Sequence, residues 1–317
     1  MNTKCLFFQV TPEDNKIDSS WYKDLTDCAI NSFKSFHPEI ETIFINDSNY
    51  FDYARSFKHY DVYEHLGLAR YILAYELMDK QNIDKLILLG CDTITCGTLD
   101  EFLNSTEDVL ATLNYPNYDS TPYWSTPQIE FITPDNRKCY EILNLNADVV
   151  CFNNKEALKK VIDLTIEHFT EFAEQGGLNE LAFVNKSYEV NIVDGPYFSS
   201  PVSYNVRSKG VFGTDMIRQG KMYRQEVMNP QVLAMTNYPF IPNGEWTPMY
   251  YWKVKNDKLY TLDNKQVKVF HFAEGLGVQS KEEFFNKVND FKTWFNKETI
   301  EFFNTKCNCK HFFNDNV

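Results

Sequence analysis

The chain has 317 residues, of which 43% are hydrophobic and 16% aromatic, so it can bury a large core and is too apolar to be disordered. Its formal net charge of −13 argues against nucleic acid or an anionic membrane surface as a partner, because both would repel it. No segment approaches the apolar length that crosses a bilayer, and the N-terminal apolar run breaks at Pro12, too early for a signal peptide. We therefore expect a cytoplasmic protein without a membrane span.

Strand and helix patterns alternate through the first half of the chain. Short apolar runs predict strands over residues 4–10 and 40–46, and helical spacing of apolar residues predicts helices over residues 21–36 and 65–81. The unalternating aliphatic run 86–89 is typical of a parallel strand that helices cover on both faces. This alternation predicts an α/β fold with a central, mostly parallel sheet flanked by helices.

The second half begins in the same way and then becomes harder to interpret. Strands are predicted over residues 108–113, 145–154 and 265–277, and amphipathic helices over residues 155–175 and 281–304. After Tyr188 prolines, glycines, asparagines and aromatic residues are frequent, and the strands look short.

The chain contains eight cysteines, several of them inside apolar runs, such as Cys5, Cys91 and Cys151. In a reducing compartment we expect them to be mostly small, buried hydrophobic side chains. The tail "CNCKH" (residues 307–311) offers three soft ligands, but its spacing matches no common zinc site. We therefore predict that the tail is a flexible segment.

The buried aliphatic run ends abruptly at Gly90-Cys91-Asp92. In parallel α/β sheets the ligand binds at the carboxyl ends of the strands, so Asp92 is a candidate for the functional edge of the sheet. From the pattern alone, a turn or capping aspartate before "TITCGTLDEF" is an equally good interpretation.

The order of four segments resembles the glycosyltransferases of the GT-A fold, most closely the family-eight group of glycogenin and the bacterial lipopolysaccharide galactosyltransferases. The four segments are "LARYILAYELMDKQNIDKLILLGCDTITCGTLDEF" (68–102), "LNADVVCFNN" (145–154), "QGGLNELAFVN" (175–185) and "VFHFAEGLG" (269–277). The resemblance implies a Rossmann-like nucleotide-diphospho-sugar transferase fold.

The resemblance also implies a division of the chain. A GT-A domain would cover residues 1–280, with a nucleotide-binding half over 1–114 and an acceptor half over 115–280. A C-terminal helical extension would cover residues 281–317. If copies of the chain associate with one another, we expect a homodimer.

By resemblance, the chain moves a hexose from a UDP-sugar to a hydroxyl of a glycan, protein or lipid-linked sugar, with retention of configuration. The diphosphate leaving group must be stabilised, and a divalent cation does this as a Lewis acid. Mn²⁺ or Mg²⁺ suits oxygen ligands, and an imidazole ligand favours Mn²⁺. The resemblance gives Asp92 and His271 as the metal ligands, although a lone histidine after a strand is more often a hydrogen-bonded edge residue.

The remaining candidates follow from the same resemblance. Nucleotide-sugar binding is expected at Gln9, Val10, Thr11, Arg70, Gly90, Cys91, Asp92, Asn146 and Gly275. Catalytic roles facing the sugar or the acceptor are expected at Asp148, Asn179 and Glu180. Without the resemblance, Arg70 would be a solvated helix charge. Acceptor sugars could stack on Tyr115, Tyr118, Tyr123 and Trp124, with simple packing as the alternative.

Several positions depart from the family pattern, among them Gly90, Asp148 and the pair Leu178-Asn179, which stands where the family has Asp-Gln. Gly90 stands where the family has the first aspartate of its Asp-x-Asp motif, so weaker metal binding is expected. Asp148 stands where the family usually has glycine, and it could contact acceptor hydroxyls or partly replace the lost carboxylate. A catalytically inactive relative that binds a sugar nucleotide or a glycan is therefore the alternative function.

Two other classes of nucleotide-binding enzyme lack their motifs here. A sugar nucleotidyltransferase shares the fold core but needs a Gly-rich, basic loop after the first strand, where this chain reads "VTPEDNK" (10–16). A nicotinamide dehydrogenase needs G-x-G-x-x-G after an early strand, whereas the only similar string begins at Gly275.

Overall fold

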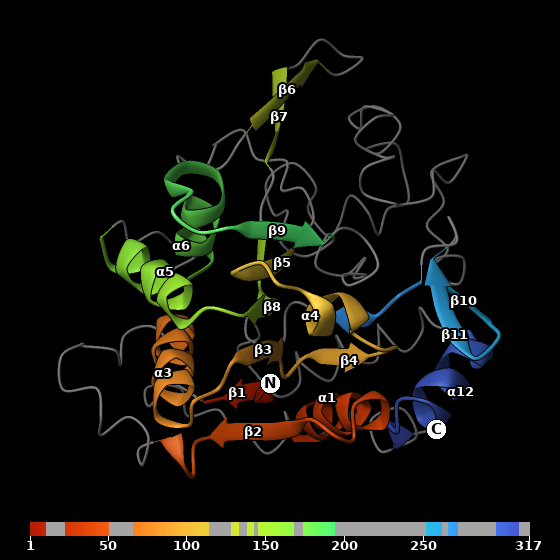
Figure 1. Ribbon diagram of the computed structural model, residues 1–317. Coiled ribbons are helices and arrows are strands. Elements are labelled where there is room, and N and C mark those ends of the chain that lie inside the picture. The colour runs from red at the N-terminus through yellow and green to blue at the C-terminus, as the bar shows by residue number, and fades with distance from the viewer. Residues whose placement is uncertain are drawn as a thin grey trace.

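A six-stranded sheet with the strand order β2-β1-β3-β8-β5-β9 forms the centre of the computed structural model (Figure 1). Its strands are β1 (Thr3–Gln9), β2 (Glu41–Asn46), β3 (Lys85–Gly90), β5 (Val109–Leu113), β8 (Leu145–Phe152) and β9 (Val190–Val193). The structure describes residues 1–10, 23–50, 66–113, 128–132, 138–142, 145–167, 174–193, 252–261, 266–271 and 296–310.

The sheet is mostly parallel, as predicted. Strand β1 pairs in parallel with β2 and β3, and β5 pairs in parallel with β9. Only β8, between β3 and β5, runs antiparallel to its neighbours within this sheet. The α/β fold class with a central sheet flanked by helices is therefore confirmed. The division at residues 114 and 280 stays a prediction, and both halves contribute strands to this one sheet.

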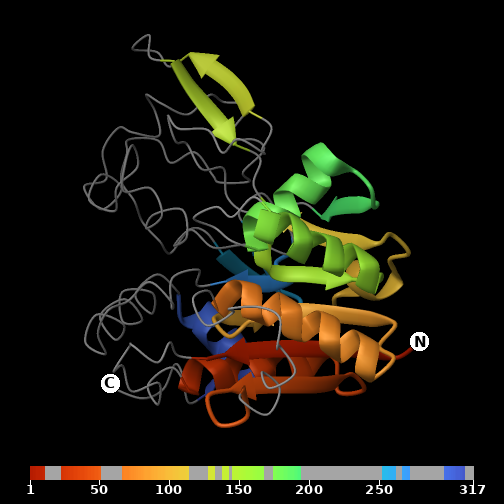
Figure 2. The ribbon, with the colours of Figure 1, turned by 90° about the vertical axis from the view of Figure 1, so that its left-hand side faces the viewer.

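Helices cover both faces of the sheet. Helices α3 (Leu66–Lys80) and α5 (Lys155–Glu167) lie side by side on one face, as Figure 2 shows, and Tyr71 of α3 packs edge-on against Phe152 of β8. Helix α1 (Lys23–Phe36) covers the other face, where Phe33 packs against Phe7 of β1. Because side chains of a strand alternate between faces, a strand that helices cover on both faces is mostly apolar, and all six residues of β3 are buried, Lys85 included.

The predicted helices over 21–36 and 65–81 correspond closely to α1 and α3. The helix predicted over 155–175 corresponds to α5 and the first residues of α6 (Glu174–Glu180), with residues 168–173 outside the described ranges. The helix predicted over residues 281–304 corresponds, in the described part of the chain, to α12 (Lys297–Thr305).

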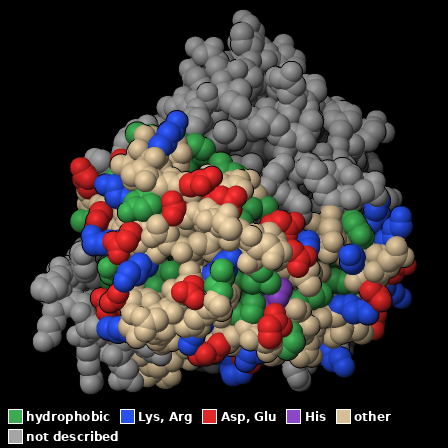
Figure 3. All heavy atoms as spheres, viewed as in Figure 1, with side chains coloured by type: hydrophobic (Ala, Val, Ile, Leu, Met, Phe, Trp, Pro, Cys, Tyr) green, Lys and Arg blue, Asp and Glu red, His purple; other side chains and the backbone are tan. Residues whose placement is uncertain are grey.

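Shorter elements surround the sheet. They are β4 (Thr93–Thr95), which pairs with β12 (Val269–His271), the hairpins β6 (Gln128–Ile132) with β7 (Lys138–Ile142) and β10 (Trp252–Lys255) with β11 (Lys258–Thr261), helix α4 (Asp100–Asn104) and the π-helix η3 (Leu181–Asn185). No helix among the described residues has both the length and the apolar character to cross a membrane. On the face in Figure 3, acidic and basic side chains are interspersed over the described part.

The C-terminal cysteines correct the sequence prediction. Cys309 forms a disulfide with Cys28 of α1, and both Cys307 and Cys309 are buried, so residues 307–309 are not a flexible segment. The expectation that the cysteines are reduced is wrong for this pair, whereas Cys5, Cys91 and Cys151 are free and buried as expected. The reason is tertiary: Cys28 and Cys309 are 281 positions apart, and a single sequence cannot show which distant half-cystines meet.

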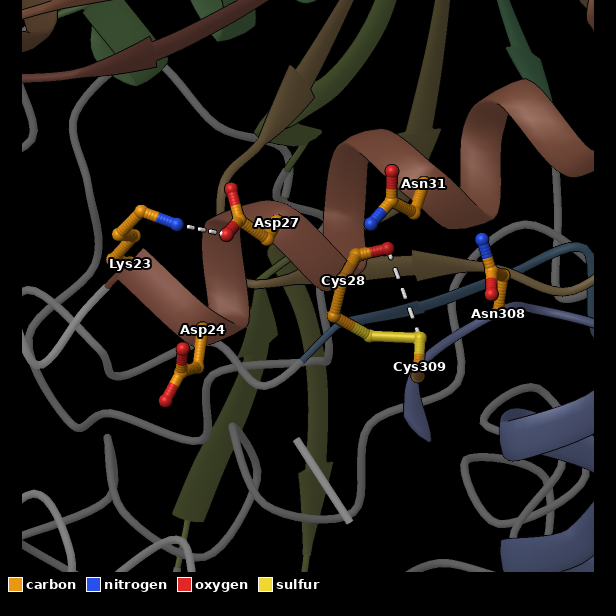
Figure 4. A pocket seen from close by; sticks show the side chains of 7 residues that line it. All are labelled: Lys23, Asp24, Asp27, Cys28, Asn31, Asn308 and Cys309. Carbon is orange, nitrogen blue, oxygen red and sulfur yellow. Dashed lines mark hydrogen bonds and ion pairs between the residues drawn. A yellow bond between two sulfur atoms is a disulfide. The ribbon is translucent and has the colours of Figure 1, made fainter. Parts of the chain in front are cut away.

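A pocket of about 300 Å³ lies over this disulfide (Figure 4). Its lining residues are Lys23, Asp24, Asp27, Cys28, Asn31, Asn308 and Cys309. The Lys23 ammonium forms an ion pair with Asp27 one helical turn away. The cation of this pocket is therefore already neutralised, and the pocket does not suit a diphosphate.

Candidate functional site

The candidate site lies where β3 ends. Asp92 follows the buried strand directly and is only 7% exposed. The hydroxyl of Thr93 donates a hydrogen bond of 2.7 Å to the carbonyl oxygen of Gly90, which closes the turn between β3 and β4 around Asp92. Burial, together with the neighbouring Asp92, raises the pKa of the Cys91 thiol, so Cys91 stays neutral within this turn.

Strand pairing brings His271 to Asp92. Strand β12 runs antiparallel to β4, and the register pairs His271 with Thr93. The Nε2 atom of the fully buried His271 lies 3.1 Å from Oδ1 of Asp92. The two residues that the resemblance gave as metal ligands are therefore side by side, although they are far apart in the sequence.

Asp148 of β8 adds a second carboxylate. Val149 pairs with Leu89, so Asp148 lies beside Gly90 on the neighbouring strand. Its Oδ2 atom is 3.7 Å from Nε2 of His271.

Arg70 of α3 reaches this carboxylate and is buried, so it is not a solvated helix charge. Its Nη1 donates to Oδ1 of Asp148, and its Nη2 donates to the Ala147 carbonyl at 2.8 Å and to Oε1 of Glu174 at 3.3 Å. Burial alone would lower the pKa of Arg70, but Asp148 and Glu174 outweigh burial and raise it. Arg70 is therefore charged and held rigidly by groups from β8 and α6.

Glu174 is a site residue that sequence reasoning missed. It begins α6 and is bound by Arg70, and a Cβ atom on Gly67 of α3 would lie 2.0 Å from its Oε2. The glycine one turn before Arg70 therefore lets α6 bring a carboxylate against α3. No clear signal in the sequence pointed to Glu174, because Gly67 lies in the first turn of α3, where a glycine is not unusual.

Asn146 and Asn179 bind backbone groups near Asp148. The Asn146 side-chain oxygen accepts from the Asp148 amide at 2.8 Å, and its Nδ2, within the described part of the chain, is buried without a hydrogen-bond partner. Asn179 accepts from the Leu145 amide at 2.9 Å and donates to the Gln175 carbonyl at 2.6 Å, which ties α6 to the start of β8. The side-chain amide of Asn179 thus binds one backbone group of β8 and one backbone group of α6.

The remaining predicted residues are divided between the described and the undescribed parts of the chain. Gln9 ends β1, and its side-chain oxygen accepts a 3.1 Å hydrogen bond from Thr26 of α1. Val10 and Glu180 are buried. Outside the described ranges lie Thr11, Gly275 and the aromatic residues Tyr115, Tyr118, Tyr123 and Trp124.

The donor atoms fit a divalent cation that is bound together with a substrate. Within the described ranges no group of three or more His, Cys, Asp or Glu residues is arranged to hold a metal ion, so the protein ligands here would be the pair Asp92 and His271. One or two protein ligands plus phosphate oxygens is the usual arrangement for Mg²⁺ at phosphate sites. The carboxylates of Asp92, Asp148 and Glu174 outnumber the Arg70 guanidinium, so a diphosphate needs an added cation to bind beside them.

Comparisons with known proteins found similar folds at low identity. No family model matches the chain, and no curated protein matches it. Galactosyltransferase LgtC, solved in complex with donor and acceptor sugar analogs, is 13% identical with a TM-score of 0.40, over 90% of this chain and 95% of that one. GlyE of Streptococcus pneumoniae TIGR4 is 15% identical with a TM-score of 0.36, over 64% of this chain and 48% of that one.

A third similar structure belongs to another enzyme class. The nucleoside-diphosphate-sugar pyrophosphorylase of Vibrio cholerae RC9 is 13% identical with a TM-score of 0.35, over 60% of this chain and 91% of that one. At TM-scores below 0.5 these likenesses do not bear on function, which we infer from the chain's own site.

Proposed function

We propose that the chain is a GT-A-fold glycosyltransferase that transfers a hexose from a UDP-sugar to a hydroxyl group of a carbohydrate or glycosylated acceptor. The observation that carries this proposal is the contact between Asp92 and His271 at the carboxyl end of β3. This edge is where α/β sheets bind nucleotides, and the pair offers one oxygen and one nitrogen donor.

Asp92 and His271 would hold Mn²⁺ or Mg²⁺, which when bound supplies a Lewis acid for the diphosphate leaving group. The turn between β3 and β4 orients Asp92, and the pairing of β4 with β12 orients His271. Both side chains are buried, so packing holds them in place at this edge.

We propose retention of configuration at the transferred sugar. The bond between C1 and the leaving oxygen breaks, the acceptor oxygen bonds to C1 on the same face, and the acceptor proton passes to the departing diphosphate. The protein then needs to orient the donor and the acceptor rather than supply a nucleophile. The ion pair between Arg70 and Asp148 holds both side chains in place, so they form a fixed surface that can orient the two substrates.

A catalytically inactive relative that binds a sugar nucleotide is the second candidate function. The absence of a side-chain carboxylate at Gly90 favours it, because the β3 motif then contributes only Asp92 to the site. The two candidates share the nucleotide site and differ only in turnover.

A donor-hydrolysis screen over UDP-, GDP- and dTDP-sugars, run with Mn²⁺ and with a chelator, tests the proposal. We expect hydrolysis of a UDP-sugar that Mn²⁺ stimulates and the chelator abolishes. Tight UDP binding in titration calorimetry without turnover of any donor would favour the inactive relative. Failure to bind any of the nucleotides would contradict both candidates.

A further inference from the structure

Positions 90 and 148 share one small volume between β3 and β8. A Cβ atom built on Gly90 would lie 2.6 Å from Oδ1 of Asp92, 3.2 Å from Cβ of Asp148 and 3.5 Å from Cγ of Asp148. The absence of a side chain at Gly90 is therefore what lets the carboxylates of Asp92 and Asp148 approach each other.

The Asp148 carboxylate and the Asp148 backbone are each held by a hydrogen bond. Arg70 binds Oδ1 of the carboxylate, and the backbone amide of Asp148 donates to Asn146. The remaining oxygen, Oδ2, lies on the side of His271 Nε2, where Oδ1 of Asp92 also lies. The Asp148 side chain is 22% exposed, against 9% for Asp92 and 0% for His271, so it is the most open of the three.

We propose that Asp148 supplies, from β8, a second negative charge beside the ligand pair Asp92 and His271, and that this charge strengthens the binding of a divalent cation together with a nucleoside diphosphate. Asp148 occupies the space that Gly90 leaves on β3, and Arg70 acts as the positioning residue that points Oδ2 toward His271. The inference rests on the proposed function. It adds that the negative charge needed for the cation comes from two neighbouring strands, one carboxylate from each.

The first test is the affinity of the full-length protein for Mn²⁺ in the presence of UDP, measured by titration calorimetry and by the electron paramagnetic resonance signal of free Mn²⁺. The variant Asp148→Asn keeps the size of the side chain and an oxygen for Arg70 but removes the charge. We expect its Mn²⁺ affinity to fall roughly 10- to 100-fold, as for residues that support a metal site. The matched control is Asp163→Asn, which changes a half-buried aspartate on α5 that forms an ion pair with Lys159, and it should bind like the wild type.

The second test moves the carboxylate from β8 to the neighbouring strand β3. Asp148→Gly alone should weaken Mn²⁺ binding, and adding Gly90→Asp to it should recover most of the affinity. The space is available because removing the Asp148 side chain vacates the volume that the new Cβ needs, and only the flexible end of Asp92 must shift. Gly90→Asp in the wild-type background lacks that space and should not strengthen binding. Circular dichroism and thermal melts show which variants are folded.

Wild-type affinity in folded Asp148→Asn would overturn the inference while leaving the proposed function intact. Loss of affinity in Asp148→Gly without recovery in the folded double variant would overturn the claim that the two positions share one carboxylate site. The wild-type protein could bind no Mn²⁺ in the presence of UDP, or bind it with an affinity that Asp92→Asn leaves unchanged. Either result would remove the proposed function and this inference together.

Discussion

Two side chains carry the proposed chemistry at the residue scale. Asp92 and His271 contact each other through a 3.1 Å approach of Oδ1 and Nε2, inside a packed edge with little solvent. A substitution that removes one donor leaves the backbone pairing of β4 with β12 unchanged, because that pairing uses main-chain groups. Loss of function can therefore be separated from loss of fold at these positions.

We expect Asp92→Ala and His271→Ala each to lower metal-stimulated donor hydrolysis by at least roughly 100-fold. Removing one electrostatic stabiliser of a leaving group typically has an effect of this size. The measurement is the hydrolysis rate of the best donor with Mn²⁺, with Asp163→Asn as the control. Rates equal to the wild type in both alanine variants would remove the site assignment.

His37 makes the stability of the protein sensitive to acid. The residue is buried, and its Nε2 accepts a hydrogen bond of 3.1 Å from the Leu99 amide, which requires the neutral ring. Burial, more than any neighbouring charge, lowers the pKa of His37 from 6.5. Below pH 6.5 the unfolded chain therefore binds a proton that the folded chain does not.

We predict that the free energy of unfolding falls as the pH drops below 6.5, by up to about 1.4 kcal/mol per pH unit from this group. The measurement is urea unfolding at several pH values from about 5 to about 7.5, a range that spans the ordinary histidine pKa. The variant His37→Gln does not titrate there and should lose this part of the slope. Equal slopes in the two proteins would contradict the assignment.

At the scale of elements, a buried lysine fastens a short helix to the sheet. Lys85 begins β3 and is only 1% exposed. Its ammonium donates to the carbonyl oxygens of Phe102 and Leu103 at 2.7 Å each and of Ser105 at 3.1 Å. These carbonyls lie at the C-terminal end of α4, where a helix has no acceptor partners of its own and where a cation is favourable.

We expect Lys85→Met to lower the free energy of unfolding by about 2 kcal/mol, because buried carbonyl groups would lose their donor. Lys80→Met, on the exposed end of α3, is the control and should change stability by less than about 0.5 kcal/mol. The measurement is chemical denaturation of both variants. A stability of Lys85→Met equal to that of the control would show that α4 does not depend on this contact.

At the scale of the whole molecule, the disulfide joins the C-terminal segment to the N-terminal half. The bond joins Cys28 and Cys309, which are 281 positions apart, so the loop that it closes contains every strand of the six-stranded sheet except β1. Disulfides persist mainly in oxidising compartments, so the cytoplasmic location expected from the sequence stays an untested prediction.

We predict that Cys28→Ala and Cys309→Ala each lower the free energy of unfolding by about 2–5 kcal/mol under non-reducing conditions. In reductant the difference from the wild type should shrink to the small packing effect of one sulfur. Non-reducing peptide mapping checks the pairing directly. Recovery of both cysteines as free thiols from folded, non-reduced protein would contradict the disulfide.

Much of the fold could be predicted because it depends on local pattern. The aliphatic run 86–89 indicated a strand buried on both faces, and the spacing of apolar residues placed α1 and α3 within two residues of their observed ends. The helix over 155–175 was predicted as one element because its amphipathic pattern continues into Glu174 and Gln175, which belong to α6.

The amino-acid sequence by itself determined the alternation of strands and helices, and with it the position of Asp92 at the carboxyl end of a buried strand. The family resemblance paired His271 with Asp92, but only the tertiary structure showed that the two residues are in contact, that Asp148, Arg70 and Glu174 meet there, and that Cys28 pairs with Cys309. The physical reason is the range of the interactions. Periodicity reports burial within one element, whereas these contacts depend on how β4 pairs with β12, β3 with β8 and α3 with α6, which no local pattern encodes.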